Sequence, residues 1–98
     1  MKQIYDVVLD AQLGQRFGTL VLDNTDGAIS GSFFLLGFEN PVKGRCVGQE
    51  LELRHKLRTA LSTLDCETHV KLHGDALFGV VRSQNSRMEL RGKKQEDQ

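Results

Sequence analysis

The stretch ELELRHKLRTALSTLDC, from Glu50 to Cys66, combines two periodicities that predict different structures. Its first half has an apolar residue at every second position, as a half-buried β-strand does. From Leu57 onward the apolar residues lie three and four positions apart, which is helical spacing. The stretch also holds four basic or potentially basic residues within five positions: Arg54, His55, Lys56 and Arg58. The rest of the chain decides between a strand, a helix and a nucleic-acid-binding patch.

A strand from Glu50 separates the apolar residues from the charged ones. Its inner face would hold Leu51, Leu53, His55 and Leu57, and its outer face Glu50, Glu52, Arg54, Lys56 and Arg58. The basic cluster then belongs to a mixed-charge outer face that water covers. Nucleic-acid binding would favour a surplus of positive charge and interleaved aromatic residues for stacking, and this chain has neither. We therefore expect no nucleic-acid partner.

The remainder of the sequence has the rhythm of an all-β meander. Single glycines and Asx residues recur every eight to twelve positions, and Asp26-Gly27 and Gly48-Gln49 suit tight turns. The runs between the turns predict strands over 4–10, 17–23, 28–36, 42–47, from 50, 66–72, 76–82 and 87–91. About eight antiparallel strands would close into a small barrel or a flattened sandwich, because closure removes exposed edges.

Two segments leave the strand pattern open. Residues 57–64 predict either one helical turn that plugs the barrel or a bent strand pair, and we favour the strand pair. The segment GFENPVKG predicts a loop shaped by Asn40-Pro41, since proline fixes φ and restricts the residue before it. We expect a single barrel domain over residues 1–92 and a polar, flexible tail over 93–98.

Length and composition exclude several classes of protein. A chain of 98 residues is one domain, and its 13 basic and 13 acidic residues balance, so no overall field attracts nucleic acid or acidic membranes. The sequence contains neither a secretory h-region nor an apolar run long enough to span a bilayer. Cys46 and Cys66 fit neither a disulfide framework nor a zinc motif and are expected as free thiols. We expect a complete, cytoplasmic protein with no membrane partner.

The first three predicted strands are partly apolar on both faces. Tyr5, Leu20 and Phe33 belong to the inner faces. The outer faces would then carry Ile4, Val8, Phe17, Val21 and Phe34, which are either scattered exposed residues or a covered surface. We expect a homodimer that forms through the outer face of these three strands, and hence a protein-interaction or accessory module.

Chemical sites are sparse. His69 and His73 alternate with apolar residues along a strand and are expected at the surface, whereas His55 points inward. A site of His55, Cys46 and Cys66 could hold a metal or an activated thiol, but no two of these residues come from one short turn. No serine elbow, phosphate loop or HExxH motif is present. We expect no enzymatic activity, no catalytic residue, no metal and no cofactor.

A small-molecule carrier of the calycin type is the alternative function. At eight strands a barrel is just wide enough for one small ligand. The residues predicted to line such a cavity are Tyr5, Phe33, Leu53 and His55.

Several short motifs resemble a family of small uncharacterised bacterial proteins of about this length. They are LLGFENPVKG at 35–44, Glu50-Leu51, Arg58-Thr59, Tyr5-Asp6-Val7, Gly14 and Gly18-Thr19-Leu20. The resemblance covers most of the chain and implies a bacterial cytosolic origin and a single β domain. It implies no activity and no site residues.

Overall fold

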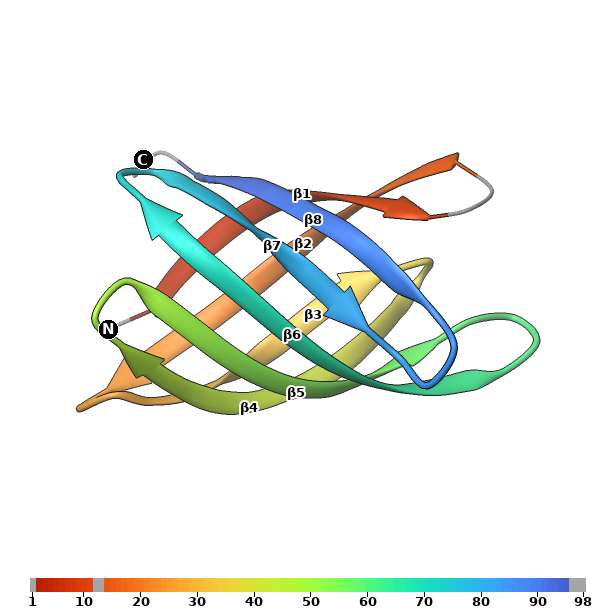
Figure 1. Cartoon of the computed structure of the whole chain (residues 1–98), viewed down its shortest axis with the longest axis horizontal. Helices are drawn as coiled ribbons and strands as arrows, with labels where there is room; N and C mark the ends of the chain where they lie inside the picture. Colours follow the sequence, from red (N-terminus) through yellow and green to blue (C-terminus); the bar gives the residue numbers. More distant parts are fainter. Residues whose placement is uncertain (1, 12–13, 96–98) are drawn as a thin grey trace.

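Eight antiparallel strands make up the protein in a computed structural model, which describes residues 2–11 and 14–95. Every consecutive pair of strands is hydrogen-bonded, and β8 also pairs with β1, so the sheet closes into a barrel (Figure 1). The strands are β1 (Lys2–Ala11), β2 (Gly14–Thr25), β3 (Ala28–Leu35), β4 (Phe38–Val47), β5 (Glu50–Arg58), β6 (Thr63–His73), β7 (Ala76–Arg82) and β8 (Arg87–Lys94). The predicted all-β meander is confirmed, and the barrel replaces the flattened sandwich.

Apolar side chains from all eight strands fill the barrel. The alternation seen in the sequence holds: Leu51, Leu53, His55 and Leu57 of β5 are buried, and the residues between them are exposed. Burying one apolar side chain contributes roughly 1.5–3 kcal/mol, so this shared core is the main stabilising term. Its members are Tyr5, Val7, Leu9, Leu20, Leu22, Ile29, Phe33, Leu35, Val42, Leu51, Leu53, Leu57, Cys66, Val70, Leu77, Val81 and Leu90.

Glycines inside the strands allow the sheet to curve. Five of them lie in strand interiors, namely Gly18, Gly31, Gly44, Gly79 and Gly92, and Gly14 begins β2. A Cβ atom at Gly31 would overlap the carbonyl oxygen of Val21, and one at Gly44 would overlap that of Glu52. The missing side chains let neighbouring strands approach closely, which gives the sharp bends that a small closed barrel needs.

The stretch from Leu57 to Leu64 is a hairpin, in agreement with the favoured strand pair. β5 continues to Arg58, residues 59–62 form the connection, and β6 begins at Thr63. The Thr59 N–H donates to the Ser62 carbonyl at 2.8 Å and closes this connection. The helical alternative is therefore wrong, because cross-strand pairing satisfies the backbone without a helix. The hairpin projects beyond the barrel as a two-stranded ribbon (Figure 1).

Two segments that the sequence predicted as loop or tail contain strand residues. The segment with Asn40-Pro41 is strand and not loop, since β4 starts at Phe38 and Pro41 lies opposite Ser32 within the β3–β4 ladder. At the other end β8 continues through Lys94, so the barrel extends two residues beyond the predicted limit at 92. The pairing of Tyr5 with Lys94 extends the last strand. Residues 96–98 of the predicted tail lie outside the described residues.

The ends of the barrel differ in what they carry. The chain ends and the β2–β3, β4–β5 and β6–β7 turns lie at one end, and the β3–β4, β5–β6 and β7–β8 connections lie at the other, called here the loop end (Figure 1). Within residues 2–11 and 14–95 there is no helix with the length and apolar character needed to cross a bilayer.

Candidate functional site

The outer face of β1–β3 carries apolar side chains in three successive rows, of which the middle row also holds Asp6 and Thr19. Ile4 lies opposite Val21, and Val8 opposite Phe17, across the β1–β2 ladder. Phe34 of β3 lies opposite Thr19 of β2, in the neighbouring row. We call Ile4, Val8, Phe17, Val21 and Phe34 the apolar face.

Exposure varies across the apolar face. Ile4, Val8 and Val21 are half-buried. Phe17 is 74% exposed and Phe34 is 40% exposed. An isolated exposed phenylalanine is unremarkable, but two phenylalanines beside three aliphatic residues form a patch of the kind that marks contact sites. The structure thus brings together the residues predicted for a dimer interface.

Leu36 belongs to a turn, whereas the sequence predicted it as the last residue of the third strand. It follows β3 and adopts a φ of 56°, in the left-handed region, and its side chain is 42% exposed. Leucine is unfavourable in that conformation, where glycine and asparagine are usual. The dipeptide Leu36-Gly37 directly after an apolar strand was the signal that could have identified this turn.

The four predicted ligand-binding residues all lie inside the barrel. Phe33 and His55 are in contact, with ring centroids 5.4 Å apart and ring planes inclined by 65°. Leu53 precedes His55 on the same inner face of β5. Tyr5 is separated from Phe33 by Leu20 in the register, and its hydroxyl donates to Gln3 Oε1 at 3.0 Å. These residues belong to the packed core, and their role in ligand binding stays a prediction.

His55 is held in one neutral form by two hydrogen bonds. Its Nδ1 lies 3.1 Å from the Lys56 carbonyl oxygen, which can only accept, so Nδ1 carries the proton. Nε2 then accepts from the Thr68 hydroxyl at 2.6 Å. Burial lowers the pKa of His55, and the hydrogen bond to the Lys56 carbonyl opposes this in part. At neutral pH, above the ordinary histidine pKa of about 6.5, the site therefore presents an uncharged imidazole.

The two cysteines are free thiols, as predicted, and only Cys66 lies beside His55. Cys66 is opposite His55 in the β5–β6 ladder, whereas Cys46 is opposite Leu51. Burial raises the pKa of the Cys66 thiol, which disfavours the nucleophilic thiolate. In the described part of the chain, no group of three or more His, Cys, Asp and Glu side chains could hold a metal ion.

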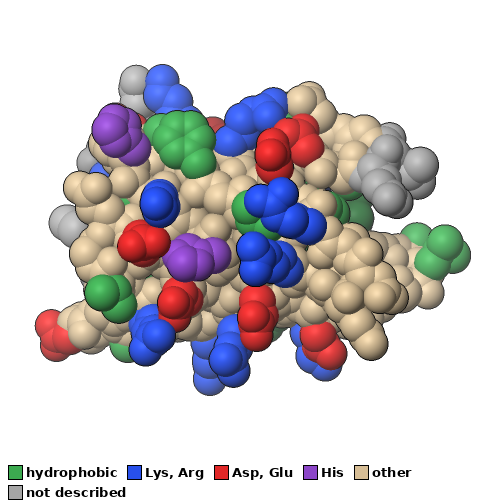
Figure 2. Space-filling model, viewed as in Figure 1, with side chains coloured by type: hydrophobic (Ala, Val, Ile, Leu, Met, Phe, Trp, Pro, Cys, Tyr) green, Lys and Arg blue, Asp and Glu red, His purple; other side chains and the backbone are tan. Residues whose placement is uncertain are grey.

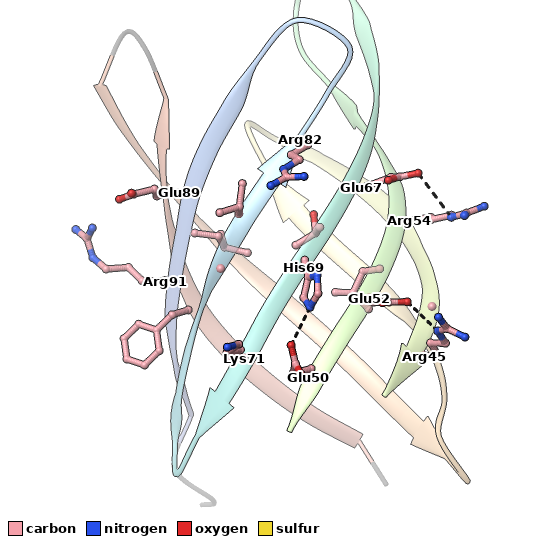
Figure 3. Close-up of a pocket in the computed structure, with 17 residues that line it drawn as sticks. Arg45, Glu50, Glu52, Arg54, Glu67, His69, Lys71, Arg82, Glu89 and Arg91 are labelled. Carbon is pink, nitrogen blue, oxygen red and sulfur yellow. Dashed lines mark hydrogen bonds and ion pairs between the residues drawn. The ribbon is translucent and has the colours of Figure 1, made fainter. Parts of the chain in front are cut away.

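A groove of about 1290 Å³ crosses the outer face of β4–β8 (Figure 3). An ion pair and a hydrogen bond line it: Arg45 Nε lies 2.8 Å from Glu52 Oε2, and His69 Nε2 lies 3.2 Å from Glu50 Oε1. The hydrogen bond from Arg45 holds the pKa of Glu52 below its ordinary value. Five Arg and Lys residues and four Glu residues line the groove, so it has little net charge. Acidic and basic side chains also intermingle over this whole face (Figure 2).

His69 and His73 are both exposed, which confirms their predicted place at the surface.

No protein-family model matches the chain, and neither the curated proteins nor the solved structures include a significant match. The resemblance to a bacterial family therefore stays a prediction.

Proposed function

We propose that the protein is a non-enzymatic β-barrel module that acts through protein contact and forms a homodimer through the apolar face. The observation that supports this most is Phe17, which is 74% exposed beside Val8 and near Phe34. Covering these side chains would remove apolar surface from water, and each square ångström contributes roughly 25 cal/mol.

The closed barrel limits how a partner can bind. The strands that carry the apolar face are each paired on both sides, β1 with β8 and β2, and β3 with β2 and β4, so a contact there would be face to face. A second copy fits such a contact because a two-fold axis places the same patch on both subunits. The formal net charge of zero means that two copies do not repel each other strongly.

The exposed area also favours a partner. The chain exposes 6650 Å². A monomer of its mass of 11.0 kDa is expected to expose about 5600 Å², so roughly 1000 Å² is in excess. That excess is comparable to the area of about 800 Å² that one subunit buries in a standard interface. Leu61 of the projecting hairpin is 96% exposed and Phe17 of the apolar face 74% exposed, so both parts of the molecule contribute to the exposed area.

A cytoplasmic location belongs to the same proposal. Both cysteines are unpaired, as is usual in a reducing compartment. The carrier function ranks second, because Tyr5, Phe33, Leu53 and His55 are packed among core side chains.

Sedimentation of the full chain tests the dimer. At tens of micromolar we expect the wild type to sediment as a dimer and the variant Phe17→Ser/Phe34→Ser as a monomer. The control Val47→Ser/Leu61→Ser also removes two exposed apolar side chains, 65% and 96% exposed, but outside the apolar face. It should remain dimeric. A strictly monomeric wild type, or a control that dissociates as readily as the face variant, would refute the interface.

A further inference from the structure

The wall of the barrel opens between β4 and β5 near the loop end. The ladder between these strands ends at Val42 and His55, although β5 continues to Arg58. Pro41 follows on the β4 side and has no N–H to donate, so the ladder cannot continue regularly through it. The two strands diverge from this point, and Figure 1 shows the β3–β4 and β5–β6 hairpins separating.

A buried asparagine holds the opening in shape. Asn40 is fully buried, and its Nδ2 donates to the Phe33 carbonyl at 3.0 Å. Its Oδ1 accepts from the Arg58 N–H at 3.1 Å and so links β4 to β5 where the ladder is absent. Both polar groups of the amide are satisfied, which makes the opening a defined feature.

A pocket of about 930 Å³ lies at this opening. Pro41, Cys66 and the neutral His55 contribute to its lining, and they offer surface without charge. The charged lining consists of five cations, Lys43, Arg54, Lys56, Arg58 and Arg82, and two carboxylates, Asp65 and Glu67. The pocket therefore has an excess of three positive charges in a protein whose formal net charge is zero.

Three of these cations face another cation directly across a ladder. Lys43 lies directly opposite Arg54, and Arg82 directly opposite Arg87. Like charges in directly opposed positions of a sheet destabilise it. Only Glu67, which lies between Arg54 and Arg82 in the same row, interrupts the positive charge.

The carboxylates of the pocket neutralise its cations only weakly. Arg54 Nε is 4.0 Å from Glu67 Oε1, and Lys56 Nζ is 3.7 Å from Asp65 Oδ1, with all four side chains largely exposed. Exposed pairs at such distances contribute little. In the described part of the chain, no ion pair joins Lys43, Arg58 or Arg82 to a carboxylate.

We propose that this pocket binds a small organic anion whose carboxylate or phosphate is held by the surrounding cations and whose uncharged part lies against Pro41, Cys66 and the His55 ring. Arginine suits both oxyanions because its guanidinium donates two parallel hydrogen bonds. A nucleic-acid strand fits less well, since no Phe, Tyr or Trp among the described lining residues offers a stacking surface. The site lies on β4–β7, away from the apolar face, and does not depend on self-association.

Two fluorescent ligands test the proposal with the full chain. Anilinonaphthalene sulfonate combines an anion with an aromatic body, and N-phenylnaphthylamine has the same rings without the sulfonate. We expect the sulfonate to bind at one site per chain, more tightly than the neutral ligand, and more weakly in half-molar sodium chloride because salt screens exposed charges. Equal affinity for the two ligands would overturn the proposal.

The variant Lys43→Gln/Arg82→Gln should weaken sulfonate binding by about tenfold, from the loss of two charge-assisted contacts. Its urea midpoint should stay about the same, because Lys43 and Arg82 each face another cation across a ladder, while Arg82 also faces Glu67 on its other side. Loss of binding through misfolding would instead lower that midpoint. The control Lys71→Gln/Lys93→Gln removes the same charge outside the pocket and should bind like the wild type.

Three further outcomes would contradict this site. The first is unchanged sulfonate affinity in Lys43→Gln/Arg82→Gln, and the second is loss of binding in Phe17→Ser/Phe34→Ser, which would place the ligand on the apolar face. The third is tight binding of a single-stranded RNA oligonucleotide that displaces the sulfonate, which would make the surface a polyanion site.

Discussion

At the scale of single residues, the polar groups of the core explain why the interior stays uncharged. His55 donates a hydrogen bond to the Lys56 carbonyl and accepts one from the Thr68 hydroxyl. The side-chain amide of Asn40 donates through its nitrogen and accepts through its oxygen. Among the described residues, no buried side-chain nitrogen or oxygen lacks a hydrogen-bond partner. An unpaired buried polar group would cost about 1–3 kcal/mol, so these contacts determine which polar residues the core tolerates.

His55 makes stability depend on pH in a definite window. Its pKa is lowered in the folded state and returns to about 6.5 on unfolding, so the unfolded chain binds more protons at mildly acidic pH. We expect the free energy of unfolding to be at its full value above pH ~7. It should then fall as the pH decreases through ~6.5 toward the lower native pKa. Urea unfolding followed by circular dichroism between pH ~7.5 and ~5 measures this, before most carboxylates titrate.

The variants His55→Gln and His69→Gln separate this effect from other titrations. His55→Gln should flatten the dependence in that window, whereas His69→Gln changes only an exposed histidine and should keep the wild-type slope. The same slope in wild type and His55→Gln would show that the buried imidazole is not the titrating group.

At the scale of elements, a turn is predicted well from sequence where its residues commonly adopt positive φ, and poorly where they do not. Asp26-Gly27 was recognised, and both residues have positive φ, at 53° and 90°. The equivalent turn at Leu36-Gly37 was assigned in part to the preceding strand, because leucine rarely adopts positive φ. The hairpin of β5 and β6 was foreseen from alternation up to Leu57, but the helical spacing beyond it gave an ambiguous signal.

The turn after β3 can be relieved of its unfavourable residue. Leu36→Asn should raise the free energy of unfolding by roughly 1 kcal/mol, because asparagine tolerates the left-handed conformation. Urea denaturation of the monomeric Phe17→Ser/Phe34→Ser background measures this without a contribution from self-association. Asp26→Asn is the control, since that turn already has an Asx residue at positive φ, and it should change stability little. A lower midpoint for Leu36→Asn would mean that the leucine side chain stabilises the monomer.

At the scale of the whole molecule, two features on different strands define the surface: the apolar face on β1–β3 and the cation-rich pocket on β4–β7. Both depend on closure of the barrel, because a closed sheet gives every strand one face toward the core and one face toward the outside. The tight curvature that closure needs depends on the glycines of the inner face. Gly44 is the clearest case, since a Cβ there would overlap the backbone of β5 at Glu52 and Leu53.

Gly44→Ala should therefore destabilise the barrel by about 3 kcal/mol, as overpacking and a backbone shift typically do. Gly48→Ala is the matched control: Gly48 has a positive φ of 62° but open space around its Cα. It should lose only about 1 kcal/mol, from conformation alone. Thermal and urea unfolding of both variants measure the difference. If both variants lost the same stability, the close approach of β4 and β5 would not be the reason for glycine at position 44.

The sequence by itself determined the strands, most of the turns and the face on which each side chain lies. These follow from local rules, namely the two-residue period of a strand and the conformational freedom of glycine. It thus placed His55 inward and Phe17 outward. Only the tertiary structure decided the closure of β1 on β8, the opening between β4 and β5, and the pairing of Lys43 with Arg54. Those features depend on register between strands, which the joint packing of the core sets and a local pattern leaves undetermined.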